Sequence, residues 1–178
     1  DLRWEGVAAL GPRRGPIRTG GTVLSRLQSN IFIVNGDWEE GQVVGWAAGA
    51  GTTLTINTAV VRAGNYSGQA VVAQSTVAGI IFSQTVANPT VYRSRSITII
   101  AYLRRASGSD AGCFLRLDDG TTQTDSAAIT TDAWTYRSVT ATIAAGATTI
   151  TISINTNATT TNAAHTFRMD DCYLIPAG

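Results

Sequence analysis

Short runs with the two-residue period of β-strands fill most of the chain from residue 30 onward. Residues 53–57 and 148–154 alternate between apolar and polar side chains, as strands do when one face is buried. Gly, Asn, Asp and Pro residues stand between the runs and favour turns. Many short strands with regular turns predict an all-β sandwich or jelly roll without helices. The other strand-like runs are residues 31–33, 69–73, 79–85, 94–104, 113–117, 134–143 and 166–174.

The size and charge of the chain fit one folded domain. It has 178 residues, of which 44% are hydrophobic and 14% are charged, so it can bury a core and is not a solvated, disordered chain. All 13 basic residues are arginine, and the formal net charge of +1 argues against a nucleic-acid-binding protein. No apolar run approaches the length of a membrane span.

The first 29 residues differ from the rest in composition. Gly and Pro residues interrupt this segment, and Arg13, Arg14 and Arg18 lie beside them. We predict an extended N-terminal arm or linker at residues 1–29 and a jelly-roll domain at residues 30–178; the alternative for the arm is a disordered tail. Because ordering a backbone costs about 1–2 kcal/mol per residue, an ordered arm is expected to lie against its own domain or a neighbour. The neighbour would be another copy of the chain or a different subunit of an assembly.

Several sequence blocks follow one another in a recognisable order. Residues 35–41 read Asn-Gly-Asp-Trp-Glu-Glu-Gly, Gly45-Trp46 follows, and residues 167–174 read Phe-Arg-Met-Asp-Asp-Cys-Tyr-Leu. Together with the blocks at 65–72, 92–104 and 134–142, they resemble carbohydrate-binding modules of the family 4, 9, 16 and 22 type over residues 31–176. The resemblance implies a galactose-binding-like β-jelly roll. Such jelly rolls also occur in phage tail and capsid-surface proteins and in bacterial surface proteins, so the fold alone does not set the function.

The sequence gives little support for catalysis. It contains one histidine, His165, and no Gly-x-Ser-x-Gly elbow, phosphate loop or zinc-ligand spacing. Asp118 and Asp119 could in principle form a carboxylate pair, but they precede Gly120 and are better explained as turn formers. We therefore predict that the protein is not an enzyme.

The family resemblance implies a structural calcium site made by Glu39, near the start of the domain, and Asp171, near its end. Calcium binds several oxygen ligands, including carboxylates and backbone carbonyls. Glu40 and Asp170 are substitutes in this hypothesis. In the alternative, the acids cap turns or pair with Arg168.

A sugar-binding site would need exposed aromatic rings and polar groups. Aromatic residues make up only 7% of the chain, and the motif positions of Trp38, Trp46, Trp134 and Phe167 are core positions. The rings that remain are Tyr66, Tyr92, Tyr102 and Tyr173, and Arg104 is among the possible polar partners. If Tyr102 and Arg104 belong to one strand, their side chains face the same side. That face could bind sugar, contact a partner or face only water.

Cys113 and Cys172 both lie in apolar β runs. We predict two free, buried thiols. A disulfide between the two strands is the alternative.

Two non-enzymatic functions follow from these observations. In the first, the protein is a structural or decoration subunit of a larger particle or surface array, such as a phage virion or tail, and uses its arm for assembly. In the second, it is a glycan-binding module of an extracellular enzyme or adhesin. Either function places the protein outside the cell, on a cell surface or in a virion.

Overall fold

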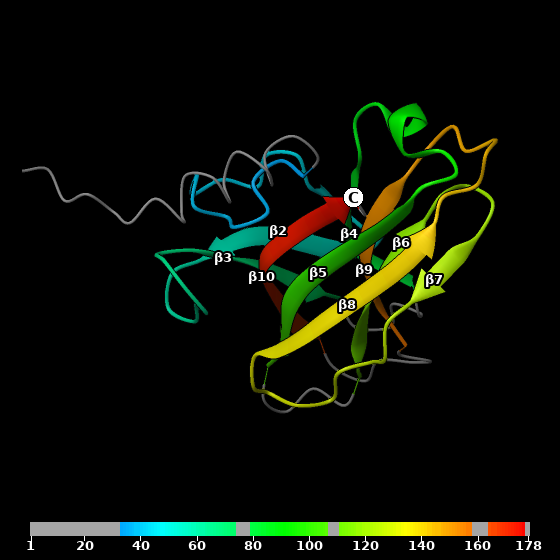
Figure 1. Cartoon of the computed structure of the whole chain (residues 1–178). Coiled ribbons are helices and arrows are strands. Elements are labelled where there is room, and N and C mark those ends of the chain that lie inside the picture. The colour runs from blue at the N-terminus through cyan, green and yellow to red at the C-terminus, as the bar shows by residue number, and fades with distance from the viewer. Residues whose placement is uncertain (1–32, 74–78, 107–110, 158–163, 177–178) are drawn as a thin grey trace, which may run out of the picture.

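The computed structural model describes residues 33–73, 79–106, 111–157 and 164–176. These residues form ten strands and one short 3-10 helix (Figure 1). The predicted arm, and with it the boundary between arm and domain, lies outside the described residues. The elements are β1 (Ala47–Ala48), β2 (Thr52–Asn57), β3 (Ser67–Val72), β4 (Gly79–Thr85), η1 (Pro89–Tyr92), β5 (Ser96–Arg105), β6 (Cys113–Asp118), β7 (Gln123–Asp125), β8 (Thr135–Thr142), β9 (Thr151–Thr156) and β10 (His165–Pro176).

The strands form two five-stranded antiparallel sheets. The first sheet has the order β1-β4-β9-β6-β7, and the second has the order β2-β3-β10-β5-β8. In Figure 1, β10, β5 and β8 run side by side in front of the strands of the first sheet. The predicted all-β sandwich is therefore confirmed. Within the described ranges, no helix has the length and apolarity needed to cross a membrane.

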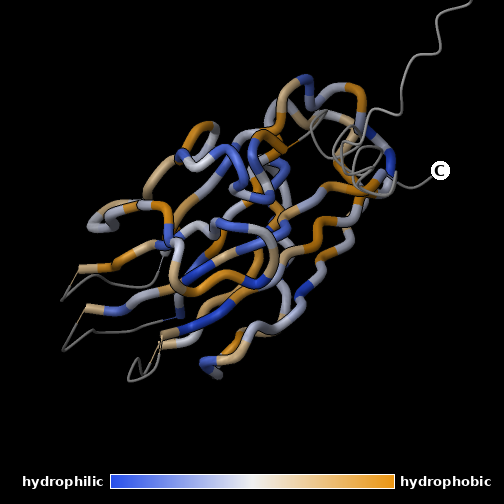
Figure 2. Tube along the Cα trace, turned by 90° about the vertical axis from the view of Figure 1, so that its left-hand side faces the viewer, coloured by the Kyte–Doolittle hydropathy of each residue, from blue (hydrophilic) through white to orange (hydrophobic). Residues whose placement is uncertain are grey.

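Alternation along the strands explains how the two sheets pack together. In β5, Ile97, Ile99, Ala101 and Leu103 are buried, whereas the residues between them are partly exposed. The hydropathy also changes repeatedly along the strands in Figure 2. Because successive side chains point to opposite faces, each sheet has an inner face in the core and an outer face away from it.

An aromatic cluster connects the 35–46 segment to the core. The Trp38 and Trp46 rings stack with centroids 5.4 Å apart, and both meet Phe82 of β4 edge to face. The indole N–H of Trp46 donates a hydrogen bond to the Asn35 carbonyl at 3.2 Å. Ile33 is also fully buried but lies in a bend, so the predicted strand at 31–33 is wrong at this residue.

Both cysteines are free and buried, as predicted. Cys113 begins β6 in the first sheet, and Cys172 lies in the irregular part of β10 in the second sheet. Burial raises the pKa of the Cys113 thiol to about 12 and raises the pKa of Cys172 as well. Both thiols are therefore protonated at neutral pH and contribute to the core as small hydrophobic groups.

Candidate functional site

The outer face of the first sheet carries a continuous row of residues across all five strands. Strand pairing places Ala47 opposite Ser83, Ser83 opposite Ser153, Ser153 opposite Arg116 and Arg116 opposite Asp125. The neighbours Leu115, Leu117, Ile152 and Ile154 point into the core. The row therefore faces outward, and four of its five members are polar or charged.

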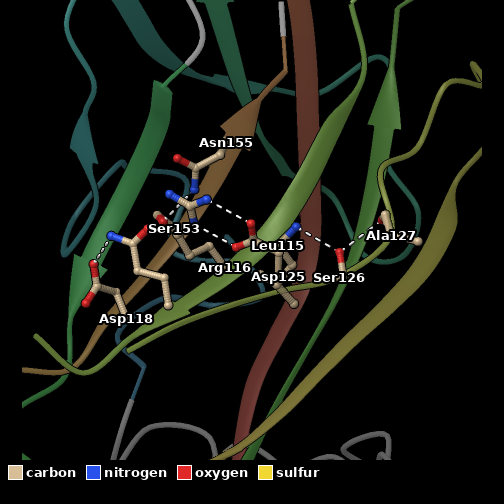
Figure 3. A network of polar contacts seen from close by, with 9 residues as sticks. Leu115, Arg116, Asp118, Asp125, Ser126, Ala127, Ser153 and Asn155 are labelled. Carbon is tan, nitrogen blue, oxygen red and sulfur yellow. Dashed lines mark hydrogen bonds and ion pairs between the residues drawn. The ribbon is translucent and has the colours of Figure 1, made fainter. Parts of the chain in front are cut away.

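The centre of this face is buried. Ser153 is only 1% exposed and Asn155 only 2% exposed, although both lie on the outer side of the central strand β9. The Asn155 side-chain N–H donates to the Ser153 hydroxyl at 2.7 Å (Figure 3). Asn155 is opposite Ile80 in β4 and Phe114 in β6, whose larger side chains flank it. Small polar side chains on β9 are thus buried between larger side chains of β4 and β6.

One side of this face holds a charged pair. The Arg116 guanidinium donates from Nε to Asp125 Oδ1 at 2.6 Å and from Nη2 to Oδ2 at 2.8 Å. It also lies over the Phe114 ring, 5.4 Å from the centroid. The hydrogen bonds to Asp125 raise the pKa of Arg116, so the cation is permanent. Such two-point pairing fixes the plane of the guanidinium and leaves its other N–H groups to point elsewhere.

On its β4 side, this face adjoins a pocket of about 510 Å³. Ile80 and Ser83 of β4 belong to both the outer face and the pocket wall. The pocket continues toward the turn between β1 and β2. Its other lining residues are Ala48, Gly49, Ala50, Thr52, Val72, Gly79, Ile81 and Thr156.

These groups bring hydrogen-bond donors and acceptors together on one face. Hydroxyl, amide, carboxylate and guanidinium groups occur together with one aromatic ring, Phe114. His165 lies in the second sheet and is only 3% exposed. Asp118 and Asp119 accept hydrogen bonds from backbone N–H groups of their own turn, at Gly120 and at Thr121 and Thr122. The prediction that they are turn formers is therefore confirmed.

The sequence-predicted sugar candidates lie elsewhere, and only two of them come together. Tyr102 and Arg104 share the outer face of β5 in the second sheet, as expected for alternate residues of one strand. The Tyr66 ring lies half-buried against Gly41. The prediction for Tyr92 is wrong. This residue is only 3% exposed, so its ring belongs to the core and offers no surface on which a sugar could stack.

The sequence did not predict a site on the outer face of the first sheet. Residues 148–154 and 113–117 were identified as strands, but their polar positions alternate in the same way as any solvated strand face. The missing information was the pairing of β9 with β4 and β6, which joins residues more than thirty positions apart in the sequence.

Of the predicted calcium ligands, Glu39 closes a loop. Its Oε1 accepts hydrogen bonds from the backbone N–H groups of Asn65 at 2.8 Å and Tyr66 at 3.1 Å. Its Oε2 accepts one from the Asn65 side chain at 3.1 Å. Glu39 thereby holds the segment that leads into β3.

Asp171, the other predicted ligand, forms an ion pair with Arg62 rather than with Arg168. Its Oδ1 accepts a hydrogen bond from the Tyr173 hydroxyl at 2.8 Å. The described residues include no group of three or more His, Cys, Asp or Glu side chains that could hold a metal. With N–H, O–H and guanidinium donors on both carboxylates, this arrangement does not fit calcium, which needs several oxygen ligands. Calcium binding stays a prediction, which thermal unfolding in calcium and in chelator would test.

Asp170 is an unusual acid beside this ion pair because it is only 1% exposed. Its carboxylate accepts hydrogen bonds from the backbone N–H groups of Arg62 at 3.0 Å, Ala63 at 3.3 Å and Asp171 at 2.9 Å. Burial disfavours the charged carboxylate more than these hydrogen bonds favour it, and the negative charge of Asp171 disfavours it further. The pKa of Asp170 is raised to about 7.

We expect Asp170 to make the protein less stable as the pH rises from about 4 to about 7. In this window the unfolded chain releases the proton, since an ordinary Asp has a pKa of about 3.9, while the folded chain retains it. The folded state then binds more protons, so the free energy of unfolding falls with pH, by up to about 4 kcal/mol. Urea unfolding in chelator at about pH 4.5 and about pH 8 measures this loss. Asp170→Asn should lose less stability between the two pH values, and an equal pH dependence in both proteins would contradict the assignment.

No family model and no curated protein matches the sequence. Solved structures do match the fold. The CBM22-1 xylan-binding domain of Paenibacillus barcinonensis Xyn10C superposes with a TM-score of 0.63 at 18% identity, covering 79% of this chain and 91% of that one. The C-terminal family 22 carbohydrate-binding module of Clostridium thermocellum Xyn10B gives 0.63 and 18%, covering 82% and 97%. The enzymatically active domain of bacteriophage CBA120 tailspike protein 4 gives 0.60 and 14%, covering 83% and 22%. The chain therefore has the jelly-roll fold of carbohydrate-binding modules, as its motifs predicted.

Proposed function

We propose that this protein is a non-catalytic glycan-binding domain and that the outer face of its first sheet holds the glycan. The observation that carries the proposal is the row of hydrogen-bonding side chains across this face, from Ser83 to the Arg116–Asp125 pair, with the Phe114 ring beside it. A few placed polar groups beside an apolar ring are what a saccharide site needs.

The chemistry of the face suits a neutral saccharide. Sugar hydroxyls both donate and accept hydrogen bonds, and the face offers the Arg116 guanidinium as a donor and the Asp125 and Asp118 carboxylates as acceptors. Phe114 supplies an apolar ring for the C–H face of a sugar. Because Arg116 is already paired with Asp125, it offers little spare positive charge to an acidic ligand.

The structural neighbours support the same proposal. The first is described as a xylan-binding domain, and the second was solved to examine cleft residues in ligand binding. Xylan is accordingly the first ligand to test.

A second proposed function is assembly into a larger particle or surface array. The tailspike domain among the structural neighbours favours it. Here the arm at residues 1–29, with Arg13, Arg14 and Arg18, would contact copies of the chain or other subunits. The arm lies outside the described residues, so this remains a sequence-based proposal. Both functions place the protein outside the cell, on its surface or in a virion.

The test compares Arg116→Leu with Arg168→Leu, a matched change on the outer face of the second sheet. Native protein is screened by affinity electrophoresis against xylan and β-1,4-galactan and on a glycan array. Affinity for the best neutral oligosaccharide is then measured by calorimetry. Arg116→Leu should weaken binding at least about tenfold, or about 1.4 kcal/mol, while Arg168→Leu should leave it unchanged. Absence of neutral glycan binding, or equal affinity in native protein and Arg116→Leu, would refute the proposal.

A further inference from the structure

Two arginines lie directly opposite each other on the outer face of the second sheet. Arg104 of β5 pairs in register with Arg168 of β10. Both side chains are only partly exposed. Like charges in directly opposed positions of an antiparallel pair destabilise a sheet. An arrangement of this kind therefore calls for a compensating group.

The described part of the chain supplies no carboxylate to either arginine. Arg168 Nε donates to the neutral Gln69 side chain at 3.1 Å, and Gln69 is itself held by Asn57 at 2.9 Å. Arg104 Nε is buried and lacks a hydrogen-bond partner among the described residues. Burial lowers the pKa of Arg168, and the charge of Arg104 lowers it further. The two arginines are thus partly buried, Gln69 supports only Arg168, and no carboxylate among the described residues pairs with either.

An aromatic pair lies next to these arginines on the same face. Tyr102 precedes Arg104 by two residues, about 7 Å along the strand. Its ring meets Tyr136 of β8 edge to face, with centroids 5.6 Å apart. Arg62 covers one face of Tyr102, at 3.5 Å from the ring centroid, whereas Tyr136 is 47% exposed. Tyr136 therefore offers the exposed ring beside the arginine pair.

We propose that Arg104 and Arg168 together bind one oxyanion, the carboxylate of an acidic saccharide, whose sugar ring lies against Tyr136. Two guanidinium groups suit one carboxylate, sulfate or phosphate, because such a group neutralises both cations and accepts several hydrogen bonds. A nucleic acid would need a longer basic stripe than this single pair. The saccharide part of the inference rests on the proposed function, whereas the oxyanion part does not. The site is on the opposite sheet from the proposed neutral-glycan face.

The experiment titrates the full chain with digalacturonate, with its neutral counterpart galactobiose and with sodium phosphate, at low ionic strength. Digalacturonate should bind at least about tenfold more tightly than galactobiose at this site, because only the acid has an oxyanion for the arginines. Arg168→Gln and Arg104→Gln should each weaken digalacturonate and phosphate binding about tenfold. Tyr136→Ala should weaken digalacturonate binding and leave phosphate binding unchanged. Arg95→Gln, which changes an exposed arginine just before β5, is the matched control and should change neither.

The ligand-free variants provide an independent readout. Removing one of two opposed cations should leave the melting temperature of Arg168→Gln equal to or above that of native protein, so lost binding would not reflect unfolding. Equal affinity for digalacturonate and galactobiose, or binding insensitive to both arginine variants, would overturn the proposal. Phosphate binding without digalacturonate binding would overturn the saccharide assignment. Tighter binding of single-stranded DNA or polyglutamate, titrated in the same way, would overturn it as well. If no neutral glycan binds to the first sheet but digalacturonate still binds at the arginine pair, only the proposed function is refuted.

Discussion

Replacing Gly68 by alanine is expected to lower the free energy of unfolding by about 3 kcal/mol or more. Gly68 lies in β3 between Ile56 of β2 and Met169 of β10, and it is buried. A Cβ at this position would overlap the six-membered ring of Trp38. Trp38 cannot easily move away, because it is fully buried and stacked on Trp46. Urea unfolding monitored by Trp fluorescence measures the loss.

Gly146→Ala is the matched control for this prediction. A Cβ at Gly146 would meet no atom within 4 Å, so its effect should stay within about 0.5 kcal/mol. If overlap with the indole is the cause, Trp38→Phe should make the Gly68→Ala change less damaging, since phenylalanine lacks the second ring. Equal losses in Gly68→Ala and Gly146→Ala would show that the contact between Gly68 and Trp38 does not constrain the fold.

Asp119→Ala is expected to destabilise the protein by about 3–5 kcal/mol. The Asp119 side chain is only 3% exposed, and its Oδ1 accepts hydrogen bonds from the backbone N–H groups of Thr121 at 2.9 Å and Thr122 at 2.7 Å. Its Oδ2 accepts one from Ala144 at 2.8 Å. Alanine would leave three backbone donors without acceptors and would separate the β6–β7 turn from the segment between β8 and β9. Urea unfolding at neutral pH measures this effect.

Asp118→Ala controls for the loss of a negative charge in the same turn. Among the described residues, the Asp118 carboxylate accepts hydrogen bonds from the Gly120 backbone N–H and from the Gln123 side chain. Both bonds are exposed to solvent, so the loss of stability should stay below about 1 kcal/mol. Burial raises the pKa of Asp119, but the backbone donors outweigh burial and lower it overall. This stabilisation is therefore present above the ordinary Asp pKa and disappears only as the pH falls below it. Equal effects of Asp118→Ala and Asp119→Ala would contradict the role given to Asp119.

The alternation of apolar and polar residues was sufficient to predict the long strands. The run predicted at 94–104 became β5, and the run predicted at 148–154 largely became β9, shifted toward the C-terminus. The edge strands β1 and β7 escaped prediction, because they are two and three residues long and consist of Ala-Ala and Gln-Thr-Asp. The helix η1 also escaped, since Pro89 reads as a turn signal.

The sites depended on information that alternation does not contain. Both outer faces show the same polar pattern, so the sequence could pair Tyr102 with Arg104 along one strand but could not place Arg168 opposite Arg104. Similarly, the burial of Ser153 and Asn155 follows from the neighbours that strand order gives to β9. Tyr92 was misplaced because sequence alone did not reveal that η1 turns its ring into the core.

Backbone amide chemical shifts, recorded while a neutral oligosaccharide from the glycan screen is titrated into the protein, test the central claim most directly. If the outer face of the first sheet holds the glycan, the shifts that move with saturation should belong to Ser83, Phe114, Arg116, Ser153 and Asn155. Residues on the outer face of the second sheet, such as Thr98 and Thr140, should stay unchanged. Movement confined to the second sheet, or no movement at saturating oligosaccharide, would contradict the account.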